Sequence, residues 1–303
     1  MKALIPALVL LFFGCIIHAQ DAESKKYTAH LNLQYYEGPD FDSLNHRLNL
    51  LVPSGIKNPP MLVWVGGGAW SKVNRQVEMD LAGKFADQGI AVATVGHRLS
   101  AATWSDSSLV PDIKHPQHVI DIARAVNFLI KHAEDFGFSS TNFFVGGFSS
   151  GAHLVALLTL DHRYLSQQGL SKDLIKGVIP IAGTFDIPHY YQVLTEAYGE
   201  QFAQKHISSV FGQSDAEMAS ASPTNFLQAD HTPMLMISGR DMLRYHLLFE
   251  EKLREADYRS VQALNLHNYG HGELWRHLSN DENSKYRNLI LEFIHENSQH
   301  IAQ

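Results

Sequence analysis

The stretch from Thr141 to Gly151 reads Thr-Asn-Phe-Phe-Val-Gly-Gly-Phe-Ser-Ser-Gly. The apolar run at residues 143–145 is typical of a buried strand, and a helical pattern of apolar residues begins at Ala152. Residues 147–151 between them have the spacing G-x-S-x-G. A turn this tight crowds the backbone around its central residue, so glycine is needed two positions before and two after it. The stretch therefore predicts strand, sharp turn and helix, with the Ser149 hydroxyl exposed at the end of the strand.

The same alternation of strand and helix extends over the rest of the chain. Further strands are expected at residues 48–53, 61–65, 90–95, 178–182, 234–237 and 261–266, and helices at 77–88, 119–130, 152–161, 245–256 and 286–295. The polar residues 20–46 contribute one more strand at the sheet edge. Alternating strands and helices predict an α/β fold with one doubly wound, mostly parallel sheet and helices on both faces.

Residues 184–230 interrupt this alternation with a less regular stretch between two expected core strands. The carboxyl edge of a parallel sheet is where ligand sites form, so we expect a short cap or a pocket wall there. An ordinary surface excursion is the alternative, although connections of this length are usually functional or disordered.

Composition places the chain among ordinary globular proteins. It has 303 residues, 45% of them hydrophobic and 18% charged, which is enough apolar material for one large core. The formal net charge is −7 and no run of basic residues appears. Nucleic acids and anionic membrane surfaces are therefore not expected as partners.

The N-terminus has the pattern of a signal peptide. Lys2 precedes an apolar run at residues 3–17, which His18-Ala19 and a polar stretch follow. We expect cleavage after Ala19, which leaves residues 20–303 as one secreted or periplasmic domain with no transmembrane segment. Cys15, the one cysteine, follows Phe-Phe-Gly in a pattern similar to a lipoprotein cleavage site, so anchoring through a lipid on Cys15 is the alternative.

Ser149 needs a base and an acid to act as a nucleophile. Asp241 lies just past one expected strand, and His271 lies in a glycine-flanked loop just past the next, so both reach the sheet edge that carries Ser149. The competing role for Asp241 is capping the helix that follows, with Asp186 as the reserve acid. His267 is the rival base, but it is taken to belong to the strand and is expected to pack.

The glycine-rich loop at residues 66–70 is suited to stabilising an oxyanion. Backbone N–H groups are the usual donors to the oxyanion that forms when a carbonyl is attacked, and glycine lets a backbone approach a ligand closely. We assign this role to the N–H groups of Gly68, Ala69 and Ser150. A plain glycine turn is the alternative.

No metal or cofactor is expected. His115 and His118 are spaced like a pair of metal ligands, but the sequence offers no third ligand near them and they stand at the start of a helix. The chemistry of a serine nucleophile requires neither a metal ion nor an organic cofactor.

Taken together, these motifs resemble the α/β-hydrolase superfamily, in particular the hormone-sensitive-lipase-like and feruloyl-esterase-like carboxylesterases, with the kynurenine formamidases as close cousins. The resemblance runs from about Leu48 to the C-terminus. It rests on Gly-Gly-Gly-Ala-Trp at 66–70, His-Arg-Leu at 97–99, the helix from 115 to 125, Gly-Phe-Ser-Ser-Gly-Ala-His at 147–153, Ala-Gly-Thr-Phe-Asp at 182–186, Ala-Ser-Pro at 221–223, Gly-Arg-Asp at 239–241 and Gly-His at 270–271.

Three residues depart from the pattern of these families. Gly66 stands where they usually have a histidine that braces the oxyanion loop, and Phe148 stands where they have a histidine before the serine. The Gly239-x-Asp241 spacing is one residue shorter than their more common G-x-x-D.

The resemblance implies a serine hydrolase that cleaves a carboxylic ester of a small acyl or aryl group. Ser149, His271 and Asp241 would form its catalytic triad. The predicted export of the chain favours an ester met outside the cytoplasm, such as an acetyl or feruloyl group on a polysaccharide. A formamidase that uses the same triad on a C–N bond, and a non-catalytic binding relative, remain the alternatives.

Overall fold

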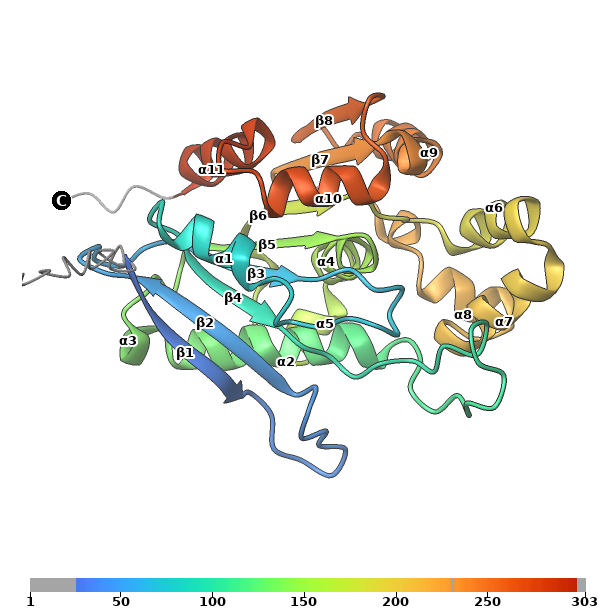
Figure 1. Ribbon diagram of the computed structural model, residues 1–303, viewed down its shortest axis with the longest axis horizontal. Helices are drawn as coiled ribbons and strands as arrows, with labels where there is room; N and C mark the ends of the chain where they lie inside the picture. Colours follow the sequence, from blue (N-terminus) through green and yellow to red (C-terminus); the bar gives the residue numbers. More distant parts are fainter. Residues whose placement is uncertain (1–25, 230–231, 299–303) are drawn as a thin grey trace, which may run out of the picture.

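The computed structural model describes residues 26–229 and 232–298, so the predicted signal peptide and Cys15 lie outside the described residues. The described chain forms an eight-stranded sheet in the order β1-β2-β4-β3-β5-β6-β7-β8 (Figure 1). β1 and β2 run antiparallel at one edge, and the other six strands are parallel. The strands are β1 Tyr27–Gln34, β2 Arg47–Pro53, β3 Met61–Val65, β4 Ala91–Val95, β5 Phe143–Phe148, β6 Ile175–Ile181, β7 Met234–Gly239 and β8 Val261–Leu266.

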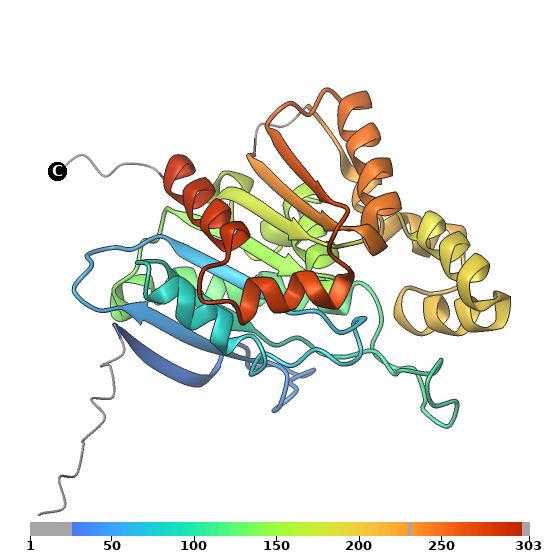
Figure 2. The same cartoon turned by 45° about the horizontal axis from the view of Figure 1, so that its top comes forward.

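Helices cover both faces of the sheet, as the alternation of the sequence predicts. The helices are α1 Met79–Ala86, α2 Gln117–Lys131, α3 Ala133–Phe136, α4 Ser150–Leu160, α5 Arg163–Ser166, α6 Ile187–Tyr198, α7 Glu200–Val210, α8 Asp215–Ser220, α9 Leu243–Glu255, α10 His271–Ser279 and α11 Lys285–Asn297. Apolar residues of α2, α4 and α9 pack in one core layer, and those of α1, α10 and α11 pack in the other (Figures 1 and 2). This is the α/β-hydrolase fold.

The central strands are fully buried because helices lie against both of their faces. Every residue of β3, β4 and β5 is buried, which explains their continuous apolar runs. β3 and β5 are neighbours in register, and Val65 at the end of β3 pairs with Gly147 near the end of β5. This pairing brings the glycine loop after β3 beside the turn after β5.

The helices that flank β5 differ in how much of their surface is buried. α2 buries one stripe of apolar residues, which includes Val119, Ile122 and Val126, as its spacing predicts. α4 buries all eleven of its residues. α4, which begins at the Ser149 turn, is therefore surrounded by the rest of the protein on every side.

Residues 184–230 are more regular than the sequence analysis expected. They contain α6, α7 and α8 and a 3-10 turn at Pro223–Phe226. In Figure 1 these helices lie beyond the ends of the arrows of β5 and β7, at the carboxyl edge of the sheet. The segment is thus a small helical layer at the predicted edge. In the described ranges, no helix is both long and apolar enough to cross a membrane.

Candidate active site

Ser149 occupies a strained turn between β5 and α4. Its backbone has φ 57° and ψ −118°, a conformation that residues other than glycine rarely adopt. The Ser149 N–H donates a hydrogen bond of 2.8 Å to the carbonyl oxygen of Ile181 at the end of β6. The neighbouring strand thus holds the serine in this conformation.

The two glycines of the turn are required by close backbone contacts. A Cβ atom on Gly151 would lie 2.0 Å from the carbonyl oxygen of Val65, and one on Gly147 would lie 2.6 Å from the backbone of Gly151. Only glycine fits either position, which gives the physical reason for the G-x-S-x-G spacing.

A pocket of about 250 Å³ opens directly over this turn. Ser149 and His271 both line it, and so does the predicted oxyanion residue Gly68. The remaining lining residues are Gly67, Val77, Glu78, Phe148, Gly272 and Trp275. The structure therefore brings together residues that are more than 200 positions apart in the sequence.

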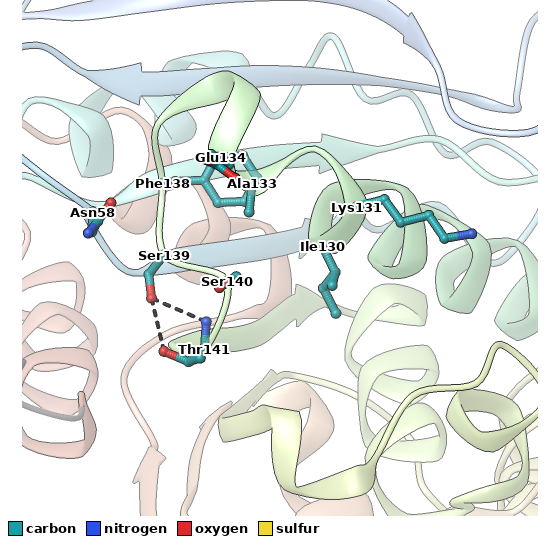
Figure 3. Close-up of a pocket in the computed structure, with 9 residues that line it drawn as sticks. All are labelled: Asn58, Ile130, Lys131, Ala133, Glu134, Phe138, Ser139, Ser140 and Thr141. Carbon is teal, nitrogen blue, oxygen red and sulfur yellow. Dashed lines mark hydrogen bonds between the residues drawn. The ribbon is translucent and has the colours of Figure 1, made fainter.

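A larger pocket of about 460 Å³ lies elsewhere, near the N-terminal end of β5 (Figure 3). Its walls come from the end of α2, from α3 and from the loop that leads into β5, and they include Lys131, Glu134 and Ser139. The Ser139 hydroxyl oxygen accepts hydrogen bonds from the backbone N–H groups of Thr141 and Asn142, at 3.3 and 3.1 Å. This pocket is remote from Ser149, which stands past the opposite end of the strand.

His271 is the first residue of α10, rather than part of a loop as the sequence analysis expected. The helix begins here because the Glu273 carboxylate accepts a hydrogen bond of 2.6 Å from the N–H of Gly270. The imidazole packs against the ring of Phe148, with 4.8 Å between ring centroids. Burial lowers the pKa of His271, and the nearby charge of Asp241 opposes this shift. The ring is therefore neutral near pH 7, as a general base must be.

Asp241 lies beside His271 but contacts its backbone. Its Oδ2 accepts a hydrogen bond of 2.7 Å from the N–H of His271, while His271 Nδ1 is buried and has no partner within the described chain. Asp241 is not the cap of the helix that follows it, because α9 begins after Met242 without a side-chain cap. Its carboxylate instead stabilises the start of α10. Its role as the orienting acid stays a prediction.

Asp186 and His267, the alternative acid and base of the sequence analysis, have other surroundings. Asp186 is the N-cap of α6, since its carboxylate accepts from the N–H of His189 at 2.9 Å and from the Thr224 hydroxyl at 3.0 Å. His267 was expected to pack, and that expectation is wrong: it follows the edge strand β8 and is exposed. Neither residue lines the pocket over Ser149.

The predicted oxyanion donors stand around the same turn. Gly68 lines the pocket with φ 148°, and a Cβ atom there would lie 2.6 Å from the N atom of Val73. Ala69 follows with φ 50°, and Ser150 is the buried first residue of α4. Ala69 and Ser150 are not among the residues that line the pocket, whereas Gly67 is. The donor roles of all three predicted residues stay predictions.

Glu78 is a residue of the pocket that the sequence analysis missed. Only 4% of its surface is exposed, and its Oε2 accepts a hydrogen bond of 2.7 Å from the indole N–H of Trp64. Burial raises the pKa of Glu78 to about 7, although the Trp64 hydrogen bond acts in the opposite direction. No pattern in the sequence marks Glu78; in the structure Gly66 leaves room for it, because a Cβ atom there would lie 2.4 Å from Glu78 Oε1.

His115 and His118 make ordinary hydrogen-bonding contacts. His118 Nε2 lies 2.9 Å from the Ser100 hydroxyl, and His115 Nε2 lies 3.5 Å from the hydroxyl of Tyr164. In residues 26–229 and 232–298, no three His, Cys, Asp or Glu side chains are grouped so that they could hold a metal ion.

Comparison with known families agrees with this geometry. The family model described as BD-FAE matches residues 48–242, about two thirds of the chain, from β2 past Ser149 to Asp241. The chain belongs to the BD-FAE family.

Curated relatives of this BD-FAE chain carry esterase names. It is 27% identical over 228 residues to esterase LipC of Mycobacterium tuberculosis, covering 71% of this chain and 53% of the relative. It is 21% identical over 241 residues to the probable carboxylic ester hydrolase LipM of the same organism, covering 78% and 51%. The chain thus spans about half the length of the curated relatives it matches.

Solved structures share the fold of this BD-FAE chain. Esterase B from Lactobacillus rhamnosis superposes with a TM-score of 0.73 at 18% identity, over 90% of this chain and 86% of that one. A truncated carbohydrate esterase from gut microbiota superposes with a TM-score of 0.71 at 17% identity, over 90% and 98%. At this level of identity the likeness establishes the α/β-hydrolase fold of the chain.

Proposed function

We propose that this BD-FAE chain is a carboxylic ester hydrolase in which Ser149 is the nucleophile. The observation that carries the proposal is the strained Ser149 turn in one pocket with His271 and the glycine loop. A hydroxyl held at the end of a strand, beside an imidazole whose pKa is lowered, suits nucleophilic catalysis. The esterase names of the relatives support the same reaction class.

The reaction proceeds through an acyl-enzyme. Ser149 Oγ attacks the ester carbonyl carbon while His271 takes the hydroxyl proton, and the N–H groups of Gly68, Ala69 and Ser150 stabilise the oxyanion. The C–O bond to the alcohol then breaks, and His271 gives its proton to the leaving oxygen. Water attacks the acyl-enzyme by the same steps and releases the carboxylic acid.

Asp241 would orient and stabilise the His271 imidazolium. Its carboxylate already accepts a hydrogen bond of 2.7 Å from the backbone N–H of His271. Nδ1 of His271 has no partner in the described chain, so it is available to donate a second hydrogen bond to this carboxylate. A change of side-chain rotamer in Asp241 or His271 would form that hydrogen bond when substrate binds, since catalytic hydrogen bonds often tighten only in the substrate complex.

The substrate is proposed to be an ester of a small acyl or aryl group, met outside the cytoplasm. The pocket of about 250 Å³ has Val77, Phe148 and Trp275 as apolar walls, and its size suits one small group of the ester, such as a short chain or one ring. The carbohydrate esterase among the structural neighbours makes an ester on a polysaccharide a candidate. Export through the predicted signal peptide 1–19, or anchoring through Cys15, would place the enzyme there.

The test is hydrolysis of p-nitrophenyl acetate and butyrate by residues 20–303. Ser149→Ala is expected to lower kcat by at least about 10³-fold, because it removes the nucleophile. The matched control is Ser140→Ala, an exposed serine near the opposite end of β5, which is expected to behave as the wild type.

Other outcomes select the alternatives. Undiminished activity in Ser149→Ala contradicts the assignment of the nucleophile. A folded wild type that cleaves N-formylkynurenine but neither ester is a formamidase. One that cleaves none of these substrates is a binding relative.

A further inference from the structure

Glu78 is a buried acid that shares a pocket with the nucleophile and base. It lies just before α1, in a chain segment that packs against the glycine loop after β3. Its surface is 4% exposed, yet it lines the pocket with Ser149 and His271. Glu78 therefore forms part of the wall of the space where substrate would lie.

The two carboxyl oxygens of Glu78 have different surroundings. Oε2 accepts the 2.7 Å hydrogen bond from Trp64 Nε1, which fixes the plane of the group. Oε1 lies beside Gly66, and for the described residues Trp64 is the one hydrogen-bond donor to this carboxyl group. Oε1 thus keeps an unused acceptor position, held in place by the bond that Oε2 makes.

Among the described residues, no other side chain of the pocket is hydrogen-bonded to Glu78. Three of the other walls are the apolar side chains of Val77, Phe148 and Trp275, and no Lys or Arg is among the lining residues. A ligand that donates to this free acceptor position gains a hydrogen bond inside a mostly apolar pocket. A substrate with a suitably placed hydrogen-bond donor would satisfy Oε1.

The position of His271 indicates which part of the substrate meets Glu78. His271 must deliver a proton to the leaving oxygen, so the alcohol part of an ester lies on the side of the imidazole. His271, Gly272 and Trp275 come from α10 and form one wall of the pocket, and Glu78 stands in the same pocket. A substituent of the alcohol that extends from the imidazole into this pocket can then reach Glu78.

We infer that Glu78 is a specificity-determining residue that accepts a hydrogen bond from a hydroxyl group on the alcohol part of the ester. The inference rests on the proposed ester hydrolysis. A hydroxyl fits better than an ammonium group, because a hydroxyl can donate to Oε1 when Glu78 is ionised and accept from it when Glu78 is protonated, whereas an ammonium group requires the anion.

The test compares two esters of nearly equal size, 2-hydroxyethyl butyrate and propyl butyrate. The quantity measured is the ratio of their kcat/KM values, which cancels any effect that a variant has on catalysis as a whole. The wild type is expected to favour the hydroxylated ester by about 10-fold, as one hydrogen bond to a carboxyl group allows. Glu78→Met, of similar length but without an acceptor, is expected to bring the ratio to about one.

Two further variants isolate the effect of Glu78. Glu78→Gln keeps a hydrogen-bonding group and is expected to give a ratio between those of the wild type and Glu78→Met. Glu251→Gln removes an exposed acid on α9 and is expected to keep the wild-type ratio. Cooperative thermal unfolding shows which variants are folded.

The outcomes separate this inference from the proposed function. Equal kcat/KM values of the wild type for the two esters would by themselves overturn the role of Glu78, whatever the variants show. A folded Glu78→Met that keeps the wild-type preference also overturns it. A wild type that hydrolyses neither butyrate ester nor p-nitrophenyl butyrate overturns the proposed function itself.

Discussion

The ionisation of His271 governs the reaction at the residue scale. Burial against Phe148 lowers the pKa of His271 below its ordinary value of 6.5, and only the neutral ring can take the proton of Ser149. Protonation therefore stops the reaction at a lower pH than an exposed histidine would allow. We predict that the acid limb of kcat/KM for p-nitrophenyl acetate has its midpoint below pH 6.5.

Glu78 needs a control in this experiment, because its pKa of about 7 places a second titration close by. The Glu78→Gln variant removes that titration and leaves His271 in place. A midpoint below 6.5 in both proteins agrees with the assignment of the base. A midpoint above 6.5 in Glu78→Gln contradicts the lowered pKa of His271.

The sequence predicted those residues of the site whose geometry is local. The Ser149 turn follows from five consecutive residues, and the contacts of Gly147 and Gly151 explain their spacing. Glu78 could not be predicted in this way. Its burial depends on Trp64 and Gly66, on a different strand and its loop, and no periodicity in its own segment marks it as a pocket residue.

At the scale of elements, the strands of the sheet were predictable and several helices at its carboxyl edge were not. Continuous apolar runs mark strands such as β3 and β5, since both faces of each strand are covered. α10 was missed because Gly272, a poor helix former, is its second residue. Its apolar Leu274 and Leu278, four positions apart, were the available signal.

The helices of residues 184–230 had capping signals that the sequence analysis did not use. Asp186 caps α6, which has proline in its first turn, and Ser214 and Glu217 form a reciprocal capping box at α8. How the two ends of this segment meet is set by tertiary contacts such as the hydrogen bond from Ile187 N to the Ser222 hydroxyl, at 2.9 Å. Caps can be read from neighbouring residues, whereas that contact joins positions 35 residues apart.

For the whole molecule, a buried ionic network ties the N-terminal edge to the core. Asp121 on α2 is fully buried and accepts hydrogen bonds from Arg98 Nε at 2.9 Å and Nη2 at 2.8 Å, and its Oδ1 lies 2.9 Å from His46 Nε2. Arg98 also pairs with Asp40 at 2.8 Å. The network joins α2, the loop after β4 and the segment before β2.

Removing the charge of Asp121 is expected to destabilise the molecule. In Asp121→Asn, Arg98 and His46 lose their buried anion, so we predict a loss of about 3 kcal/mol in the free energy of unfolding near pH 7. Burial alone would raise the pKa of Asp121, but its close contacts with His46 and Arg98 outweigh this and lower the pKa to about 2, from an ordinary 3.8. The stabilisation is then present above about pH 4 and is lost as the pH falls toward 2.

Urea unfolding at several pH values measures both effects. The difference between the wild type and Asp121→Asn should shrink as the pH falls from about 5 toward 2. Asp135→Asn, at an exposed acid on α3, is the control and should stay within about 0.5 kcal/mol of the wild type. A constant difference across this range contradicts the network as the source of acid sensitivity.

The effect of Glu78 on the stability of the molecule has the opposite pH dependence to that of Asp121. Its pKa rises from an ordinary 4.5 to about 7 on folding, because burial disfavours the charged form. The native state therefore binds a proton that the unfolded chain releases, and stability falls as the pH rises through this range. The full effect is about 3 kcal/mol, of which about 2.5 kcal/mol falls between about pH 5 and about pH 8.

Glu78→Gln cannot ionise, so it should escape this loss. We predict that its free energy of unfolding, measured in urea relative to the wild type, is higher at about pH 8 than at about pH 5 by about 2.5 kcal/mol. Glu251→Gln, exposed on α9, should show no such change. An equal difference at both pH values would mean that Glu78 is ionised at no cost in the folded protein. Such a carboxyl group would lie in water rather than behind the glycine loop, and the hydroxyl recognition inferred for it would fail with this prediction.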